Sequence, residues 1–114
     1  MSAPATVVAL VRDLMDRSRF GTLSSSGVPV HFVRDAPALR ERVVGIDPAT
    51  TVVVDLAAPD ALDAIAAAVD ADGVVRVVAF GSHVDRDRLD QAHGAGAEVM
   101  ARSAFFGRLD DLVR

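Results

Sequence analysis

Short apolar runs rich in β-branched residues alternate along this chain with longer segments whose apolar residues recur at helical spacing. The runs expected to form strands are Thr6–Val11, Val28–Val33, Thr51–Leu56, Val74–Phe80 and Ala97–Ala101. The segments expected to form helices are Leu14–Leu23, Pro37–Val44, Pro59–Val69, Asp85–Ala92 and a last helix capped by Ser103, with Phe105 or Phe106, Leu109, Leu112 and Val113 facing inward. Strands that are apolar throughout are typical of a parallel sheet covered on both faces. The pattern predicts an α/β three-layer sandwich in which residues 1–114 form one domain.

The composition is that of one globular domain and excludes several classes of protein. The 114 residues are 51% hydrophobic and include no cysteine, so disulfides, thiol nucleophiles and cysteine-bound metals are excluded. No apolar run approaches the roughly 20 residues that span a bilayer, and the N-terminus lacks the basic region of a signal peptide. We therefore expect a cytoplasmic protein without a membrane partner. The twelve basic residues are all arginines dispersed over a chain of net charge −4, so direct binding to nucleic acid is not expected.

Polar residues stand where several of the predicted strands end. In chain order they are Arg12 and Asp13, Asp55, then Gly81, Ser82 and His83, and finally Arg102 and Ser103. Because the carboxyl ends of parallel strands meet at one edge of a sheet, we expect these residues to lie close together. Two interpretations stay open at this point: a functional site, or the polar loops that any such edge presents to water.

Two segments carry a resemblance to a known family. Asp55 ends a valine-rich strand and Pro59 opens a helix four residues later, while the segment from Gly96 leads through a short strand to the basic residue Arg102. Together they resemble the receiver domain of bacterial two-component response regulators, over essentially the whole chain. The resemblance implies a flavodoxin-like fold with parallel strand order 2-1-3-4-5. It also implies that Asp55 occupies the position of the phosphoacceptor, near an acidic pair that holds Mg²⁺, a hydroxyl residue and a lysine.

The residues at these positions depart from the family pattern. Arg12 stands where the first acid of the metal pair belongs, so Mg²⁺ would rest on Asp13 and Asp55 alone. Arg102 stands where the lysine belongs. The other departures are Gly81 at the hydroxyl position with Ser82 one residue late, Ser103 in place of a proline, and Val99 in place of an aromatic residue.

The fixed charge of Arg12 predicts a pocket that is neutralised without a metal ion. Phosphoryl transfer to a carboxylate needs Mg²⁺ and a second cation on the transferring oxygens. We expect the Arg12 guanidinium to pair with Asp13 or Asp55 instead, which would make the chain an atypical receiver, or pseudo-receiver. Two alternatives stay open: Asp55 serves only as an ion-pair partner of Arg12 or Arg102, or the chain is a conventional receiver that tolerates its substitutions.

The leading functional hypothesis is a stand-alone regulatory protein, not an enzyme, that binds a protein partner in a signalling pathway. We expect output through another chain, because no output domain follows Arg114. Receiver domains commonly bind partners through their fourth helix, fifth strand and fifth helix. Here that surface would include Arg86, Arg88, Leu89, Val99, Phe105, Phe106 and Arg108, and a homodimer through it is also plausible.

The alternative hypothesis is a small α/β enzyme or small-molecule binder. Its pocket would be formed by Asp13, Asp55, Ser82, His83 and Arg102. The two hypotheses differ in the cavity they require. A receiver-like site is expected to be a shallow acidic depression, whereas an enzyme or binder needs a concavity of some hundreds of Å³.

Overall fold

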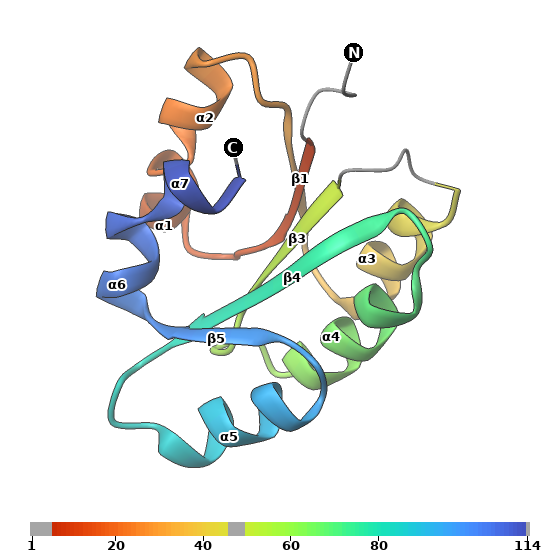
Figure 1. The fold of residues 1–114 in the computed structure, drawn as a ribbon, viewed down its shortest axis with the longest axis vertical. Helices are drawn as coiled ribbons and strands as arrows, with labels where there is room; N and C mark the ends of the chain where they lie inside the picture. The colour runs from red at the N-terminus through yellow and green to blue at the C-terminus, as the bar shows by residue number, and fades with distance from the viewer. Residues whose placement is uncertain (1–5, 46–49, 114) are drawn as a thin grey trace.

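The computed structural model describes residues 6–45 and 50–113, which contain a five-stranded parallel sheet (Figure 1). Its strands are β1 (Thr6–Leu10), β2 (Val30–Val33), β3 (Thr50–Asp55), β4 (Val74–Gly81) and β5 (Glu98–Ala101). They lie in the order β2-β1-β3-β4-β5, which confirms the flavodoxin-like topology. The N-terminal residues 1–5 and Arg114, on which the sequence analysis also drew, lie outside the described residues.

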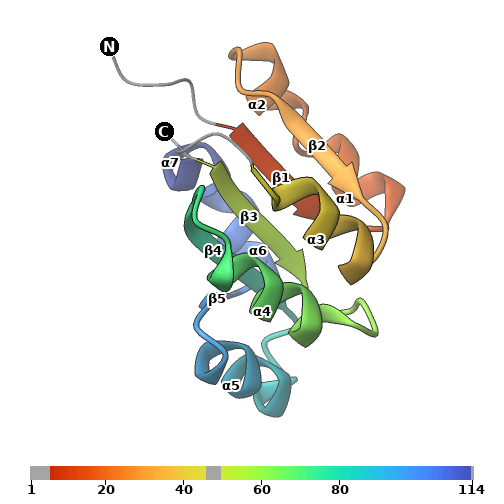
Figure 2. The same ribbon diagram turned by 90° about the vertical axis from the view of Figure 1, so that its right-hand side faces the viewer.

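Helices cover both faces of the sheet and form the outer layers of the sandwich (Figure 2). One face carries α3 (Ala36–Val43), α4 (Ala61–Asp70) and α5 (Arg86–Gly94); the other carries α1 (Leu14–Ser18), α2 (Gly21–Ser25), α6 (Arg102–Gly107) and α7 (Leu109–Val113). Alternate residues of each central strand pack into opposite layers: Val8 and Leu10 toward α3 and α4, Val7 and Ala9 toward α2 and α6. This two-sided burial explains why the central strands are apolar throughout. No helix in the described ranges is both long and apolar enough to cross a membrane.

The segment Leu14–Leu23, expected as one helix, is divided into α1 and α2 at Arg19 and Phe20. The Phe20 ring is almost fully buried and contacts the rings of Phe32, Phe105 and Phe106. Gly21, which follows, favours a helix less than other residues do. Tertiary packing of Phe20 beside a weak helix former therefore accounts for the break.

The last helical segment of the chain differs from the prediction in the residue that caps it, but its buried residues are the predicted ones. Strand β5 runs directly into α6, so Ser103 lies inside the helix, and Ala101 at the N-cap offers no side-chain acceptor. The expectation that Ser103 caps this helix is therefore wrong. The inward-facing residues are confirmed: Phe105, Leu109, Leu112 and Val113 are all buried.

Candidate functional site

The carboxylate of Asp13 is used by the helix that follows β1. Its Oδ1 accepts hydrogen bonds from the backbone N–H groups of Met15 (2.9 Å) and Asp16 (3.1 Å), which would otherwise lack partners at the start of α1. Arg12 is exposed, and in the described part of the chain it forms no ion pair with Asp13 or Asp55. The expected neutralisation by Arg12 is therefore not found, because the Asp13 carboxylate serves as a helix cap and the Arg12 side chain is solvated.

The guanidinium that enters the site belongs to Arg102, and its partner is Asp16. Arg102 follows β5 directly; its Nη1 donates to Asp16 Oδ2 at 2.5 Å and its Nη2 donates to Asp16 Oδ1, so the pair is bidentate. The Asp16 side chain is 3% exposed, whereas that of Arg102 is 45% exposed. These hydrogen bonds raise the pKa of the Arg102 guanidinium. The pair joins the end of β5 to α1, which lies 86 residues earlier in the chain.

Asp16 was missed as a site residue, although the sequence contains a signal for it. Asp16, Phe20 and Leu23 are spaced at i, i+4 and i+7, which places all three on one helical face. Phe20 and Leu23 are core residues, so an acid on the same face is expected to be buried and to need a cation. All three side chains are buried in spite of the break between α1 and α2.

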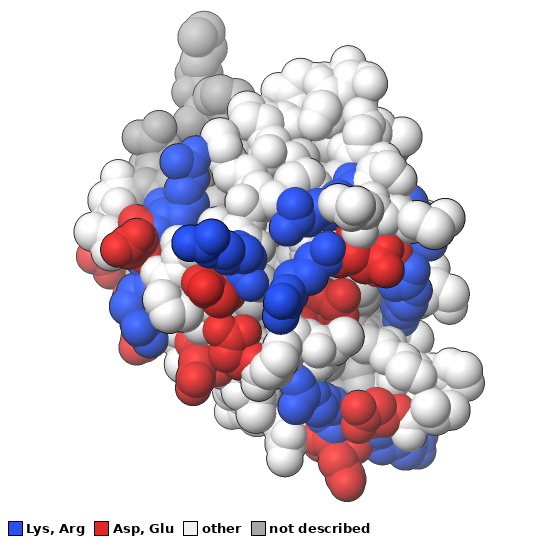
Figure 3. All heavy atoms as spheres, turned by 180° about the vertical axis from the view of Figure 1, so that it is seen from behind, with Lys and Arg blue, Asp and Glu red and all other residues white. Residues whose placement is uncertain are grey.

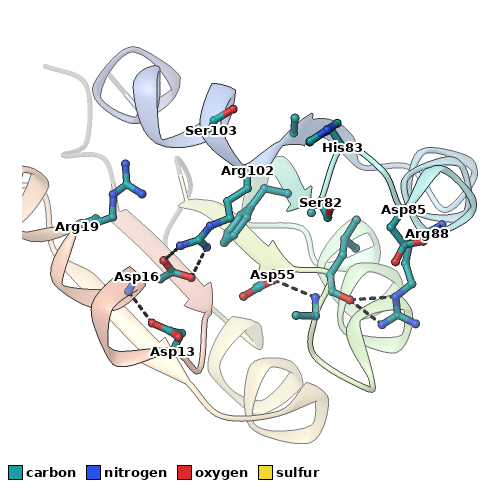
Figure 4. Close-up of a pocket in the computed structure, with 15 residues that line it drawn as sticks. Asp13, Asp16, Arg19, Asp55, Ser82, His83, Asp85, Arg88, Arg102 and Ser103 are labelled. Atoms are coloured by element: carbon teal, nitrogen blue, oxygen red, sulfur yellow. Dashed lines mark hydrogen bonds and ion pairs between the residues drawn. The ribbon is translucent and has the colours of Figure 1, made fainter.

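Asp55 lies at the end of β3, half-buried, between the Asp16–Arg102 pair and the β4–α5 loop (Figure 4). Its Oδ1 accepts one hydrogen bond, from the N–H of Ala57 at 2.9 Å, and it forms no ion pair within the described residues. Burial raises the pKa of Asp55, and the carboxylates of Asp16 and Asp13 add to this, against the opposing effects of the Ala57 N–H and of Arg102. A role for Asp55 as the ion-pair partner of Arg12 or Arg102 is therefore not supported.

Replacing Asp55 by asparagine should raise stability at pH 7. Since folding raises the pKa of Asp55, ionisation costs the folded state more than the unfolded one. The contribution of the wild-type Asp55 carboxyl to stability is fully present below its ordinary pKa of about 3.9 and is lost as the pH rises through the folded-state pKa, so the gain from Asp55→Asn should be present at pH 7 and absent at about pH 3. We expect a gain of less than about 1 kcal/mol, because much of the side chain is solvated. Urea unfolding at pH 7 and about pH 3 measures it; a less stable variant at pH 7 would contradict this account.

The loop after β4 brings Gly81, Ser82 and His83 to the same edge. A side chain at Gly81 would lie 3.3 Å from two carbon atoms of Leu56, which is tight, so the family's hydroxyl position is closely packed here. Ser82 is exposed, and its Oγ accepts a hydrogen bond from the N–H of Val84 at 3.4 Å. His83 is exposed, and the described residues show no hydrogen bond that links it to Ser82 or Asp85. The loop therefore contains no activated serine.

Two residues of the expected partner surface are used inside the protein. Arg88 donates from Nε and Nη2 to the carbonyl of Leu56 (3.0 and 2.7 Å) and from Nη2 to that of Ala58 (2.8 Å), which fixes the loop after Asp55. Phe105 is fully buried and stacked on Phe80, with ring centroids 4.5 Å apart. The rest of that surface is accessible: Arg86 and Arg108 are exposed, and Leu89, Val99 and Phe106 are half-buried.

The polar residues at this edge surround a cavity of about 760 Å³ (Figure 4). Four carboxylates line it (Asp13, Asp16, Asp55 and Asp85), together with three guanidinium groups (Arg19, Arg88 and Arg102). Gly81, Ser82, His83 and Ser103 also line it, so the predicted convergence is confirmed for all the edge residues except Arg12. Arg12 lines an adjacent hollow of about 390 Å³, which it shares with Asp13 and Asp55. The volume of the larger cavity lies in the range of small-molecule sites, but this cavity is broadly open to solvent, so the volume alone does not separate the two hypotheses.

The residues present do not fit the Mg²⁺ that the fold family implies. Mg²⁺ requires a near-octahedral shell of oxygen ligands. Here Arg12 replaces one acid of the pair, Asp13 caps α1, and Asp16 is bound by Arg102. No group of three His, Asp or Glu side chains that could hold a metal ion occurs in the part of the chain that the structure describes.

Comparison with known proteins connects the chain to one fold. No protein-family model matches the sequence, and no curated protein matches it. Among solved structures, the receiver domain of a Pseudomonas aeruginosa sensor histidine kinase, crystallised with magnesium in its active-site cleft, superposes with a TM-score of 0.78 at 14% identity over 97% of this chain and 95% of its own. A Thermotoga maritima response regulator gives 0.71 at 17% identity (97% and 98% covered). An R. palustris response regulator of red-light signalling gives 0.70 at 15% (95% and 90%). The chain therefore has the fold of response-regulator receiver domains.

Proposed function

We propose that this chain is a single receiver-like regulatory domain that signals by binding a protein partner, without conventional phosphorylation of Asp55. The Asp16–Arg102 ion pair carries the proposal. A phosphoryl group on a carboxylate needs Mg²⁺ and a free cation to neutralise its oxygens. Here the residue at the lysine position is held by a buried carboxylate, and the donor set does not fit Mg²⁺.

The likeness to receiver domains and response regulators supports a signalling role, since those proteins share this fold over nearly the whole chain. The accessible residues of α5, β5 and α6 offer a surface for a protein partner or for a second copy of the chain. They are Arg86, Leu89, Val99, Phe106 and Arg108. On the face seen in Figure 3, basic and acidic side chains lie next to one another, without the uniform basic surface that nucleic acid favours.

A second candidate function is the binding of a small molecule, which the cavity of about 760 Å³ favours. The same cavity gives little support to an enzyme, because Ser82 lacks a base in hydrogen-bonding contact among the described residues. Regulation by a bound ligand is compatible with the proposed signalling role, since both use a receiver-like domain that acts through another protein.

Incubation with acetyl phosphate and Mg²⁺, followed by intact-mass measurement, tests the proposal. We expect the wild type to gain no phosphoryl group. The matched variant, Arg12→Asp combined with Arg102→Lys, restores two of the family residues and should gain a hydroxylamine-labile adduct that the further change Asp55→Asn removes. A conventional receiver domain serves as the positive control. An adduct on the wild type that disappears in Asp55→Asn would contradict the proposal.

A further inference from the structure

We propose that the cavity binds a small organic cation, an ammonium or amidinium group with an apolar substituent, and that Asp55 is its counter-ion. The inference rests on the proposed function and extends it: the bound cation would be the signal to which the regulatory domain responds. It rests on the charge balance of the cavity and on its apolar wall, and it holds whichever protein the chain binds.

The cations of the cavity are already engaged. Arg102 is paired with Asp16, and Arg88 donates to the carbonyls of Leu56 and Ala58. The Arg19 guanidinium lies 4.1 Å from the centroid of the Phe106 ring, in a cation–π contact. None of the three forms an ion pair with Asp55 among the described residues.

The four carboxylates of the cavity differ in their partners and in their burial. Asp13 caps α1, Asp16 binds Arg102, and Asp85 caps α5 by accepting from the Arg88 N–H at 3.3 Å. Asp55 is the fourth; of its two oxygens only Oδ1 receives a hydrogen bond from the described residues, although a carboxylate accepts about four. The cavity thus has one carboxylate more than it has guanidinium groups. Asp13, Asp55 and Asp85 all lack a guanidinium partner among the described residues, and Asp55 is the one of these three that is half-buried and not exposed.

The shape of the cavity favours an organic cation over a bare metal ion. About 760 Å³ is far more than one ion fills, and part of the wall is apolar: Ala57 and Ala101 are accessible, with the buried side chains of Leu56 and Phe80 behind them. An amphiphilic cation would place its charge against Asp55 and its apolar part against this wall. It would also counter the burial that raises the pKa of Asp55, because an adjacent positive charge favours the ionised carboxylate.

Amide NMR titrations of the full chain with matched probes test this. The cations are benzylammonium, benzamidinium and butylammonium; benzyl alcohol and benzoate are neutral and anionic counterparts, and MgCl₂ is a separate arm. We expect at least one of the three cations to give saturable shifts at Leu56, Ala57, Gly81 and Arg102, and to bind at least about tenfold more tightly than benzyl alcohol, a difference of about 1.4 kcal/mol.

Two variants separate the Asp55 charge from folding. Asp55→Asn keeps an acceptor for the Ala57 N–H and should weaken cation binding at least about tenfold. Asp35→Asn is the matched control, because Asp35 is also half-buried, accepts one backbone N–H, from Ala38, and lies outside the cavity; it should leave binding unchanged. Equal binding of charged and neutral probes, saturable binding of Mg²⁺ alone, or no saturable shift with any of the three cations would overturn the proposal. Phosphorylation is read separately by mass, so the two proposals can fail independently.

Discussion

Replacing Arg102 by glutamine should lower the free energy of unfolding by about 2 kcal/mol. The change leaves the Asp16 carboxylate, 3% exposed, without its bidentate cation. A buried charge that loses its partner keeps its desolvation cost, whereas the lost attraction alone would be modest because Arg102 is itself half-exposed. Urea unfolding monitored by circular dichroism measures the loss, and Arg86→Gln, at an exposed arginine of α5, should change stability by no more than about 0.5 kcal/mol.

A double-mutant cycle isolates the pair itself. Asp16→Asn alone should also destabilise the protein, because it leaves the guanidinium without a carboxylate. The double variant Asp16→Asn with Arg102→Gln should then cost less than the sum of the two, with a coupling energy of about 1–3 kcal/mol. Strict additivity would show that the two side chains do not interact in solution, and the proposed reason for the inactive phosphorylation site would be lost.

Phe105→Ala should destabilise the protein by about 3–4 kcal/mol, the largest loss expected of any substitution discussed here. Phe105 is fully buried and stacked on Phe80 with the ring planes 14° apart, and its ring also contacts those of Phe20 and Phe106. Truncation removes this apolar burial and leaves a cavity between the sheet and α6, since the surrounding rings can collapse only in part.

Phe106→Ala is the natural control for this variant. Phe106 neighbours Phe105 in sequence but is only half-buried, under the Arg19 guanidinium. We expect it to cost at least about 1 kcal/mol less, because part of its ring is already in contact with water. Equal losses in urea unfolding would mean that both rings are core residues and that Phe106 is not available to a partner.

The strands were predictable because their signal is local. Continuous valine-rich runs such as Val52–Val54 can be buried only in a sheet covered on both faces, and the predicted strands agree with the observed ones to within two residues. The order of the strands in the sheet could not be predicted in the same way, because hydrophobic periodicity says nothing about which strands are neighbours. The correct order came only from the resemblance carried by Asp55, Pro59 and Arg102. The break at Phe20 was not predictable, since it depends on rings contributed by β2 and α6.

The membership of the site was predictable only in part, since Asp16 and Arg19 were missed and Arg12 lies outside the cavity, and the pairing of its side chains was not predictable. Strand ends located Asp13, Asp55 and Arg102 at one cavity, because parallel strands bring their carboxyl ends together. Which acid an arginine meets depends on side-chain packing between distant segments, and here Arg102 meets Asp16, 86 residues away, while Arg12 remains exposed. The size of the cavity was not predictable either, because it depends on how the loops after β3 and β4 fold back, including the contact between Arg88 and the Leu56 carbonyl.

The most direct test of the account is an amide NMR titration with Mg²⁺, followed by beryllofluoride as a mimic of an acyl phosphate. If Arg102 is held by Asp16 and the remaining carboxylates do not form a shell for Mg²⁺, the spectrum should stay unchanged at Asp13, Asp55 and Ser82 through both additions. Metal-dependent shifts at these residues that spread through Arg102 into α6 and α7 would contradict the account, and the chain would then be a phosphorylation switch in spite of Arg12.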